Sequence, residues 1–337
     1  MDLLTNRNGM ETSAPPGDAA VVHAANTSDI DEQAALLRGW NQTYDQISAG
    51  RFSGSFLEAQ FHRVQLFREI TSNALQQTGS LPKGTIAVGV PVSLRGNATF
   101  CGRPCDGQQL HVFSGNDGFE FFSPRGLDIV GFVLHACDLR RALTSDELED
   151  VWPSLAQPHL RFVDLNALNR VRRVFSDIRD VLAEASVSPV DPIRLSSMSR
   201  DVIATVVNSL ASGYRDKFDV PKAKRVLIVG NARDLVSEFP HDFMCIADLC
   251  RELGISRRAL QQSFQETLGV KPSAYIRAVR MNGARRAIKT ANSVAEAATL
   301  WGFWHFGRFA HDYQMMFGEL PSEAFRRHHG AHEQIGC

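Results

Sequence analysis

Apolar residues follow two different periods along this chain. Between residues 40 and 135 they form short runs that end at Gly, Pro, Asn or Asp, as in the segments 85–91, 119–124 and 129–134. Runs of this kind predict strands of a mostly antiparallel sandwich or small barrel. Between residues 145 and 212 the apolar positions recur every three or four residues, which predicts helices with one buried face. The expected fold class is therefore α+β, with a β-rich N-terminal sandwich or barrel accompanied by helices.

These helices need a surface against which to bury their apolar faces. The apolar stripes run from Leu165 to Leu210. The predicted sheet is one candidate for that surface, and a second copy of the chain is the other. The second candidate makes them dimerisation helices, and on this basis we expect a homodimer.

The last third of the chain contains an internal repeat. Val294 stands 48 residues after Ile246, and Gly302 stands 48 residues after Gly254. Such a repeat indicates two copies of one supersecondary unit. Each copy predicts a short helix, a tight turn and a second helix, the helix-turn-helix layout whose second helix enters the major groove of DNA. The expected elements of this all-α domain are a first helix-turn-helix over 246–268, a linking helix over 273–289 and a second helix-turn-helix over 294–317.

The second helix of the first copy has an apolar face and a polar face. Ser256 is a natural N-cap, and Leu260 and Phe264 lie one turn apart on the inner face. Arg can pair with guanine O6 and N7, and Gln with adenine N6 and N7. Polar residues opposite an apolar stripe are often only solvated, but two copies flanking one helix favour DNA binding. The candidate DNA-binding residues of this copy are Ser256, Arg257, Arg258, Gln261, Gln262 and Gln265.

The second copy has a more aromatic composition. Its inner face is formed by Phe309, Tyr313 and Phe317. The aromatic residues of its turn are also expected in the core, namely Trp301, Phe303 and Trp304. Phe306 either contacts a thymine methyl or packs against the turn, and the sequence leaves both open. The candidate DNA-binding residues of this copy are His305, Phe306, Gly307, Arg308 and His311.

Charge is unevenly distributed along the chain. Residues 221–337 contain 16 Lys and Arg against 11 Asp and Glu, whereas the rest contains 20 against 26. This asymmetry suits a polyanion-binding module joined to a separate domain. The predicted linking helix is strongly basic through Arg277, Arg280, Arg285, Arg286 and Lys289. Its length of about 26 Å would let helices at its ends reach successive major grooves about 34 Å apart.

A chain of 337 residues is too long for one ordinary domain. It begins without the basic and apolar blocks of a signal peptide, and no apolar run is long enough to cross a membrane. We therefore expect a cytoplasmic protein without a membrane partner. The expected parts are a disordered tail over 1–35, an effector-binding or dimerisation domain over 36–212, a linker over 213–223 and a DNA-binding domain over 224–330.

No catalytic motif stands out in the sequence. The alternative hypothesis is a DNA-binding module fused to a cysteine-based alkyl-transfer or repair enzyme, with Cys101, Cys105 and Cys137 as candidate acceptors. No basic cluster that would favour a thiolate lies near them in the sequence. The histidines of the N-terminal part have no metal-ligand spacing either. We therefore expect no catalytic residue, no metal and no cofactor.

Over residues 224–329 the chain resembles the AraC/XylS family of bacterial transcription regulators. The resemblance is carried by Gly254, Ser256, Leu260, Phe264, Gly269, Pro272, Tyr275, Ile276, Arg280, Gly302, Phe303, Phe309, Phe317, Gly318 and Pro321. More specifically, the segment 301–307 resembles the regulators of ethanolamine-utilisation operons, as does the segment 40–46. His311 and Gln314 depart from the family, which often has basic residues at these positions.

The resemblance implies a transcription regulator, and an activator in particular. Such a protein binds double-stranded promoter DNA through two helix-turn-helix units and works with RNA polymerase. Its N-terminal domain commonly dimerises, binds a small effector, or does both. The resemblance assigns DNA reading to the candidate residues of both second helices named above.

Overall fold

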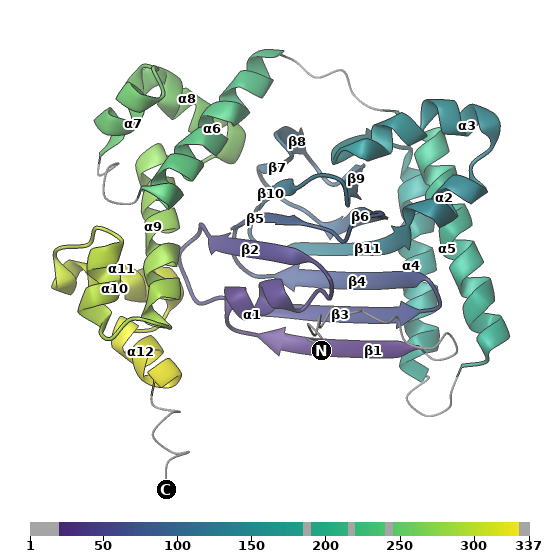
Figure 1. Ribbon diagram of the computed structural model, residues 1–337, viewed down its shortest axis with the longest axis horizontal. Coiled ribbons are helices and arrows are strands. Elements are labelled where there is room, and N and C mark those ends of the chain that lie inside the picture. The colour runs from purple at the N-terminus through teal and green to yellow at the C-terminus, as the bar shows by residue number, and fades with distance from the viewer. Residues whose placement is uncertain (1–19, 185–189, 215–219, 240–244, 330–337) are drawn as a thin grey trace, which may run out of the picture.

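The computed structural model describes residues 20–184, 190–214, 220–239 and 245–329 (Figure 1). A β-rich N-terminal part has a group of its own helices on one side and an all-helical C-terminal part on the other. This arrangement confirms the predicted α+β class, with strands in the first part and helix-turn-helix units in the second.

Two antiparallel sheets form the N-terminal part. The seven-stranded sheet has the order β1 (Val21–Thr27), β3 (Gly54–Phe61), β4 (Val64–Thr71), β11 (Leu127–His135), β6 (Thr85–Ser93), β9 (Gln109–Ser114) and β12 (His159–Phe162). The five-stranded sheet has the order β2 (Asn41–Gln46), β5 (Leu75–Ser80), β10 (Phe119–Ser123), β7 (Ala98–Phe100) and β8 (Arg103–Cys105). Alternate residues of both sheets, such as Phe67, Phe113 and Phe121, fill the space between them.

The helices of the N-terminal part pack on the outer face of the seven-stranded sheet. They are α2 (Ala136–Ala142), α3 (Ser145–Asp150), a short 3₁₀ helix (Trp152–Ala156), α4 (Leu165–Glu184) and α5 (Pro192–Ser212). Val171, Phe175 and Val206 on these helices share one buried cluster with Val88 and Phe132 of the sheet. Of the two candidate partners for the apolar stripes, the structure selects the sheet. The stripes are therefore no evidence for a dimer.

The predicted disordered tail over 1–35 is wrong for its last part. Its residues 1–19 lie outside the described residues, but β1 pairs with β3 along its whole length, and α1 (Ile30–Ala35) follows. Asp29 caps this helix, since its Oδ1 accepts from the backbone N–H groups of Asp31 and Glu32. A strand that depends on a partner 30 residues away gives little local signal, which explains the error.

Seven helices form the C-terminal part within the described residues. They are α6 (Val220–Glu238), α7 (Ile246–Glu252), α8 (Arg257–Leu268), α9 (Pro272–Ile288), α10 (Val294–Leu300), α11 (Phe306–Phe317) and α12 (Pro321–His329). Leu260 and Phe264 are buried in one cluster, and Phe309 and Tyr313 in another. Residues 215–219 of the predicted linker over 213–223 lie outside the described residues, and α6 already begins at Val220, within the predicted linker.

Glu69 is an unusual carboxyl group inside the N-terminal part. Its side chain accepts hydrogen bonds from Gln33 Nε2 at 3.0 Å and from the Tyr44 hydroxyl at 3.3 Å. Burial raises the pKa of Glu69 to about 7, although these two hydrogen bonds act in the opposite direction. A raised folded-state pKa means that folding favours the protonated form.

We expect Glu69→Gln to remove a pH dependence of folding. In the native protein, ionisation of the buried Glu69 carboxyl should lower the free energy of unfolding by up to about 3 kcal/mol as pH rises from about 4.5 to 7. Urea unfolding of both proteins at pH 5 and pH 8 measures the effect. The variant should gain stability relative to the native protein only at pH 8, whereas the exposed control Glu149→Gln should gain at neither pH. Equal shifts at both pH values would contradict the assignment.

Candidate nucleic-acid interface

The first helix-turn-helix consists of α7 and α8. The Ser256 hydroxyl accepts from the Ala259 backbone N–H at 3.1 Å, so it caps α8 as its position suggests. Gly269 ends the helix with φ of 69°, a left-handed conformation that favours glycine. All candidate DNA-binding residues of this copy are exposed: Ser256, Arg257, Arg258, Gln261, Gln262 and Gln265.

The second helix-turn-helix consists of α10 and α11. Helix α11 begins at Phe306, and the preceding His305 makes no side-chain capping bond, unlike Ser256 in the first copy. Gly318 ends α11 in the left-handed region, as Gly269 ends α8. All candidate DNA-binding residues of this copy are exposed: His305, Phe306, Gly307, Arg308 and His311.

The two predicted DNA-reading faces border neighbouring hollows of about 570 Å³ each. One hollow is lined by Arg258 and the glutamines of α8, and the other by His305 and Arg308 of α11. Ile246 and Ser273 line both hollows. The hollows therefore meet along the start of α9.

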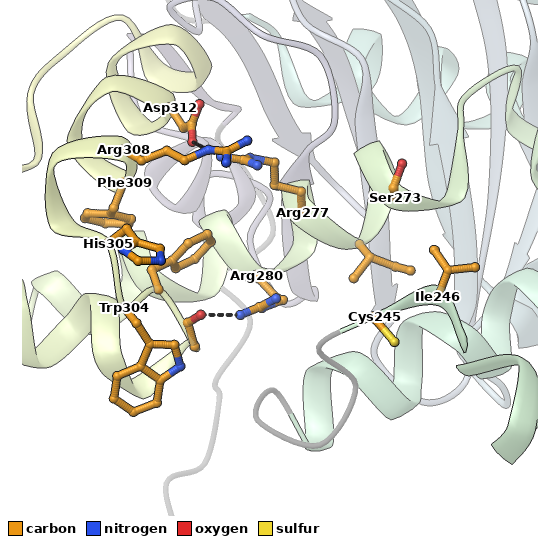
Figure 2. A pocket seen from close by; sticks show the side chains of 13 residues that line it. Cys245, Ile246, Ser273, Arg277, Arg280, Trp304, His305, Arg308, Phe309 and Asp312 are labelled. Atoms are coloured by element: carbon orange, nitrogen blue, oxygen red, sulfur yellow. Dashed lines mark hydrogen bonds and ion pairs between the residues drawn. The ribbon is translucent and has the colours of Figure 1, made fainter. Parts of the chain in front are cut away.

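Figure 2 shows the hollow between the two copies. Asp312 on α11 forms ion pairs with Arg277 of α9 and with Arg308, whose Nε lies 3.8 Å away. Arg280 donates from Nε to the carbonyl oxygen of Trp301 at 2.9 Å and from Nη2 to that of Gly302 at 2.7 Å. These contacts fix the second copy to the linking helix.

The basic residues of the linking helix do not form a free polyanion-binding surface. Arg277 and Arg280 bind the second helix-turn-helix, as described above. The other three pair with carboxylates of the N-terminal part: Arg285 with Asp29 at 2.8 Å, Arg286 with Asp45 at 2.7 Å and Lys289 with Asp31 at 2.5 Å. The interpretation of α9 as a basic rod facing DNA is therefore corrected, because its charges hold the protein together.

A pair of amide hydrogen bonds joins the same two parts. Asn282 of α9 accepts from the Gln46 backbone N–H at 3.0 Å and donates to the Gln46 carbonyl oxygen at 2.8 Å. Asn282 thus satisfies both backbone groups at the end of β2. Burial raises the pKa of the neighbouring Asp45, although Arg286 acts in the opposite direction.

One residue of the hollow was misassigned from the sequence. Trp301 and Phe303 pack against the core of the second copy, as expected. Trp304 instead leaves 57% of its surface exposed and lines the hollow (Figure 2). Aromatic bulk alone favoured burial, and the position of Trp304 on the outer side of the turn could not be read from composition.

Two of the three candidate cysteines do not resemble reactive thiols, whereas Cys137 is exposed and its Sγ lies 3.4 Å from Arg63 Nη2. Burial raises the pKa of Cys101 to about 12 and also raises the pKa of the Cys105 thiol. A buried protonated thiol is a poor nucleophile. Across the described ranges there is no group of three or more His, Cys, Asp or Glu residues that could hold a metal ion. The repair-enzyme alternative therefore has no support from the structure.

A helix-turn-helix domain family matches residues 249–327 of the chain. The "Probable thc operon regulatory protein" of Rhodococcus erythropolis is 30% identical over 195 residues, covering 56% of this chain and 59% of that protein. The "XylDLEGF operon transcriptional activator 1" of Pseudomonas putida is 40% identical over 77 residues, covering 22% of this chain and 23% of that protein. The C-terminal part therefore contains a helix-turn-helix domain, and the two relatives are named as transcription regulators.

The curated relatives match only part of their own length to this chain. The chain spans less than two thirds of the length of either relative. A solved structure, the probable AraC family transcriptional regulator from Rhodopseudomonas palustris, is 31% identical and covers 30% of this chain and 97% of its own, but its TM-score of 0.28 carries no argument. Among the described residues, none of the helices combines the length and apolarity needed to cross a membrane.

Proposed function

We propose that this protein is a sequence-specific transcription regulator that binds promoter DNA and activates transcription. The observation that carries the proposal is the pair of exposed helix faces, on α8 and α11, which border hollows that meet along α9. Helix α9 has 17 residues, and at 1.5 Å per residue it is about 26 Å long. This spacing supports reading of two successive major grooves, whose centres lie about 34 Å apart on one side of the duplex.

Footprinting of the purified protein on DNA upstream of its own gene tests this proposal. We expect two protected segments about one helical turn apart. Uniform weak binding without a protected site would count against sequence-specific regulation. Activation itself is supported by the relatives that are named transcriptional activators, and transcription in vitro with RNA polymerase measures it.

We expect Arg258→Ala to weaken and broaden recognition of one half-site. An exposed Arg at the start of a recognition helix can make a bidentate contact to guanine, and its loss costs about 1–3 kcal/mol of discrimination. Fluorescence anisotropy with the footprinted site and with single-base variants measures the change. The control Arg173→Ala removes an exposed arginine of α4 in the N-terminal part and should leave binding unchanged. Equal affinities for Arg258→Ala and the native protein would contradict the groove assignment.

The remaining assignments are also proposals. The N-terminal domain over 36–212 would dimerise, bind a small effector, or do both, while the DNA-binding domain over 224–330 acts on promoters in the cytoplasm. A groove between α2 and α5, lined by Ile203, Ala204 and Val207, supports a homodimer now that the helical stripes do not. The mass of the protein in solution distinguishes one copy from two.

The resemblance of residues 301–307 to the regulators of ethanolamine-utilisation operons suggests ethanolamine as an effector. Its support comes from this segment, the segment 40–46 and the segment 119–124. The relatives matched above are regulators of thc and xyl operons. Isothermal titration with ethanolamine tests the suggestion directly.

A further inference from the structure

The two DNA-reading faces offer different chemistry. On the first copy, Arg258 and the glutamines of α8 present hydrogen-bonding groups. Across residues 246–268, all of which are described, no large apolar side chain is exposed. The second copy exposes two large apolar side chains at and just before the start of α11, Trp304 at 57% and Phe306 at 49%, and another, Leu300 at 54%, at the end of α10.

The core of the second copy does not account for these exposed side chains. Phe309, Tyr313 and Phe317 are all buried, with at most 5% of their surface exposed. Trp301 and Phe303 pack against this core, whereas Trp304 and Phe306 do not belong to that cluster. Of the two interpretations of Phe306 left open by the sequence, packing of the turn is therefore disfavoured.

Gly307 adds a second observation at the same place. It lies in the first turn of α11, where a glycine costs about 1 kcal/mol of helix stability relative to alanine. A Cβ at Gly307 would meet no heavy atom within 4 Å, so the fold does not require a glycine here. A missing side chain next to an exposed aromatic ring instead permits close approach of a ligand to the helix backbone.

The exposed ring of Phe306 beside Gly307 matches one chemical feature of the major groove. The thymine C5-methyl is the apolar group that base edges present there. We infer that the second half-site is read through thymine methyl groups, with Phe306 as the residue that determines this specificity and Trp304 beside it. This inference rests on the proposed function. Arg308, which Asp312 holds at the edge of the hollow, is then left to bind phosphate or a neighbouring base.

The test begins with selection of binding sites from random duplex DNA by the full-length protein. The same selection with Arg258→Ala relaxes one half-site and so identifies the other as the target of α11. Each thymine in that second half-site is then replaced by deoxyuridine, which lacks only the C5-methyl. We expect each methyl that Phe306 contacts to contribute about fourfold to the affinity, as burial of one methyl group does.

Variants of α11 test which side chain is responsible for the affinity difference between the thymine and deoxyuridine duplexes. Phe306→Ala should bind the thymine and deoxyuridine duplexes equally, whereas Phe306→Leu should retain part of the difference. Met315→Ala is the matched control, because it removes another exposed apolar side chain of α11 that is 59% exposed and should keep the full difference. Circular dichroism melting verifies that all three variants fold.

The failures of the inference and of the proposed function have different signatures. Selection without any enriched sequence would overturn the proposed function and this inference with it. An enriched site whose second half lacks thymine, or tolerates deoxyuridine, would overturn only the inference. The same holds if Phe306→Ala keeps its sensitivity to deoxyuridine and loses only activation by RNA polymerase, since the apolar patch would then be a protein-binding surface.

Discussion

Asp29→Asn will destabilise the protein by about 3–5 kcal/mol. Asp29 and Arg285 form an ion pair at 2.8 Å, and their side chains are only 11% and 6% exposed. Removal of one partner from a buried pair leaves the other charge without compensation, which is far more costly than the loss of a surface pair. Nη1 of Arg285 already has no hydrogen-bond partner within the described part of the chain. Asparagine keeps the N-cap of α1, so the substitution isolates the charge.

Urea unfolding followed by tryptophan fluorescence measures this effect. Asp31→Asn is the matched control, because its pair with Lys289 is about one-quarter exposed on each side and should contribute at most about 1 kcal/mol. A double-mutant cycle between Asp29→Asn and Arg285→Ala then isolates the pair itself. Equal losses of unfolding free energy for Asp29→Asn and Asp31→Asn would show that the buried pair stabilises the protein no more than the partly exposed pair does.

The pH dependence of this difference follows from the pKa of Asp29. Burial alone would raise that pKa, but Arg285 and Lys289 outweigh it and hold the pKa below its ordinary value. A lowered folded-state pKa means that the stabilisation is present above the ordinary pKa and is lost as pH falls through the folded-state value. The gap between native protein and Asp29→Asn should therefore persist from pH 8 to 5 and close below about pH 4.

The contacts of α9 show that part of the basic charge in the C-terminal part is already paired within the chain. The count of basic and acidic residues favoured a polyanion-binding C-terminal part. The structure shows that three of the basic residues of α9 are neutralised by Asp29, Asp31 and Asp45 inside the same chain. Composition reports which charges exist, but it cannot report which of them are already paired.

Local signals in the C-terminal part were sufficient to place helices α7 to α11, whereas α6 and α12 were not predicted. Ser256 and Gly269 mark the ends of α8 by capping chemistry that acts within one turn, so their positions can be read without knowledge of the fold. The exposure of Arg258 and Arg308 follows from the same helical period. Their contacts with DNA stay predictions.

Features that depend on distant contacts could not be read in this way. Strand β1 is held by β3, and the apolar stripes of α4 and α5 are held by the sheet. Trp304 is exposed because the turn before α11 directs it outward, which its bulk did not reveal. In each case the deciding contact lies with residues that the local pattern does not identify.

Arg280→Ala will loosen the second helix-turn-helix selectively. The Arg280 guanidinium binds the carbonyl oxygens of Trp301 and Gly302 and lies 5.0 Å from the ring centre of Phe303. Burial, followed by the charge of Arg277, lowers the pKa of Arg280, so these carbonyls compensate for the burial of a charge. Hydrogen bonds from a charged group contribute about 1.5–3 kcal/mol each, and we expect a total loss of about 3 kcal/mol.

Hydrogen exchange of backbone amides distinguishes this effect from general destabilisation. Amides of α10 and α11 should exchange faster in Arg280→Ala, whereas those of α7 and α8 should not change. The control Arg251→Ala removes an arginine of α7 that is 77% exposed, and it should leave the exchange of both copies nearly unchanged. In DNA binding, Arg280→Ala should lose protection at the second half-site while the first remains occupied. An equal increase in exchange across both copies would show instead that Arg280 stabilises the whole domain and not the second copy in particular.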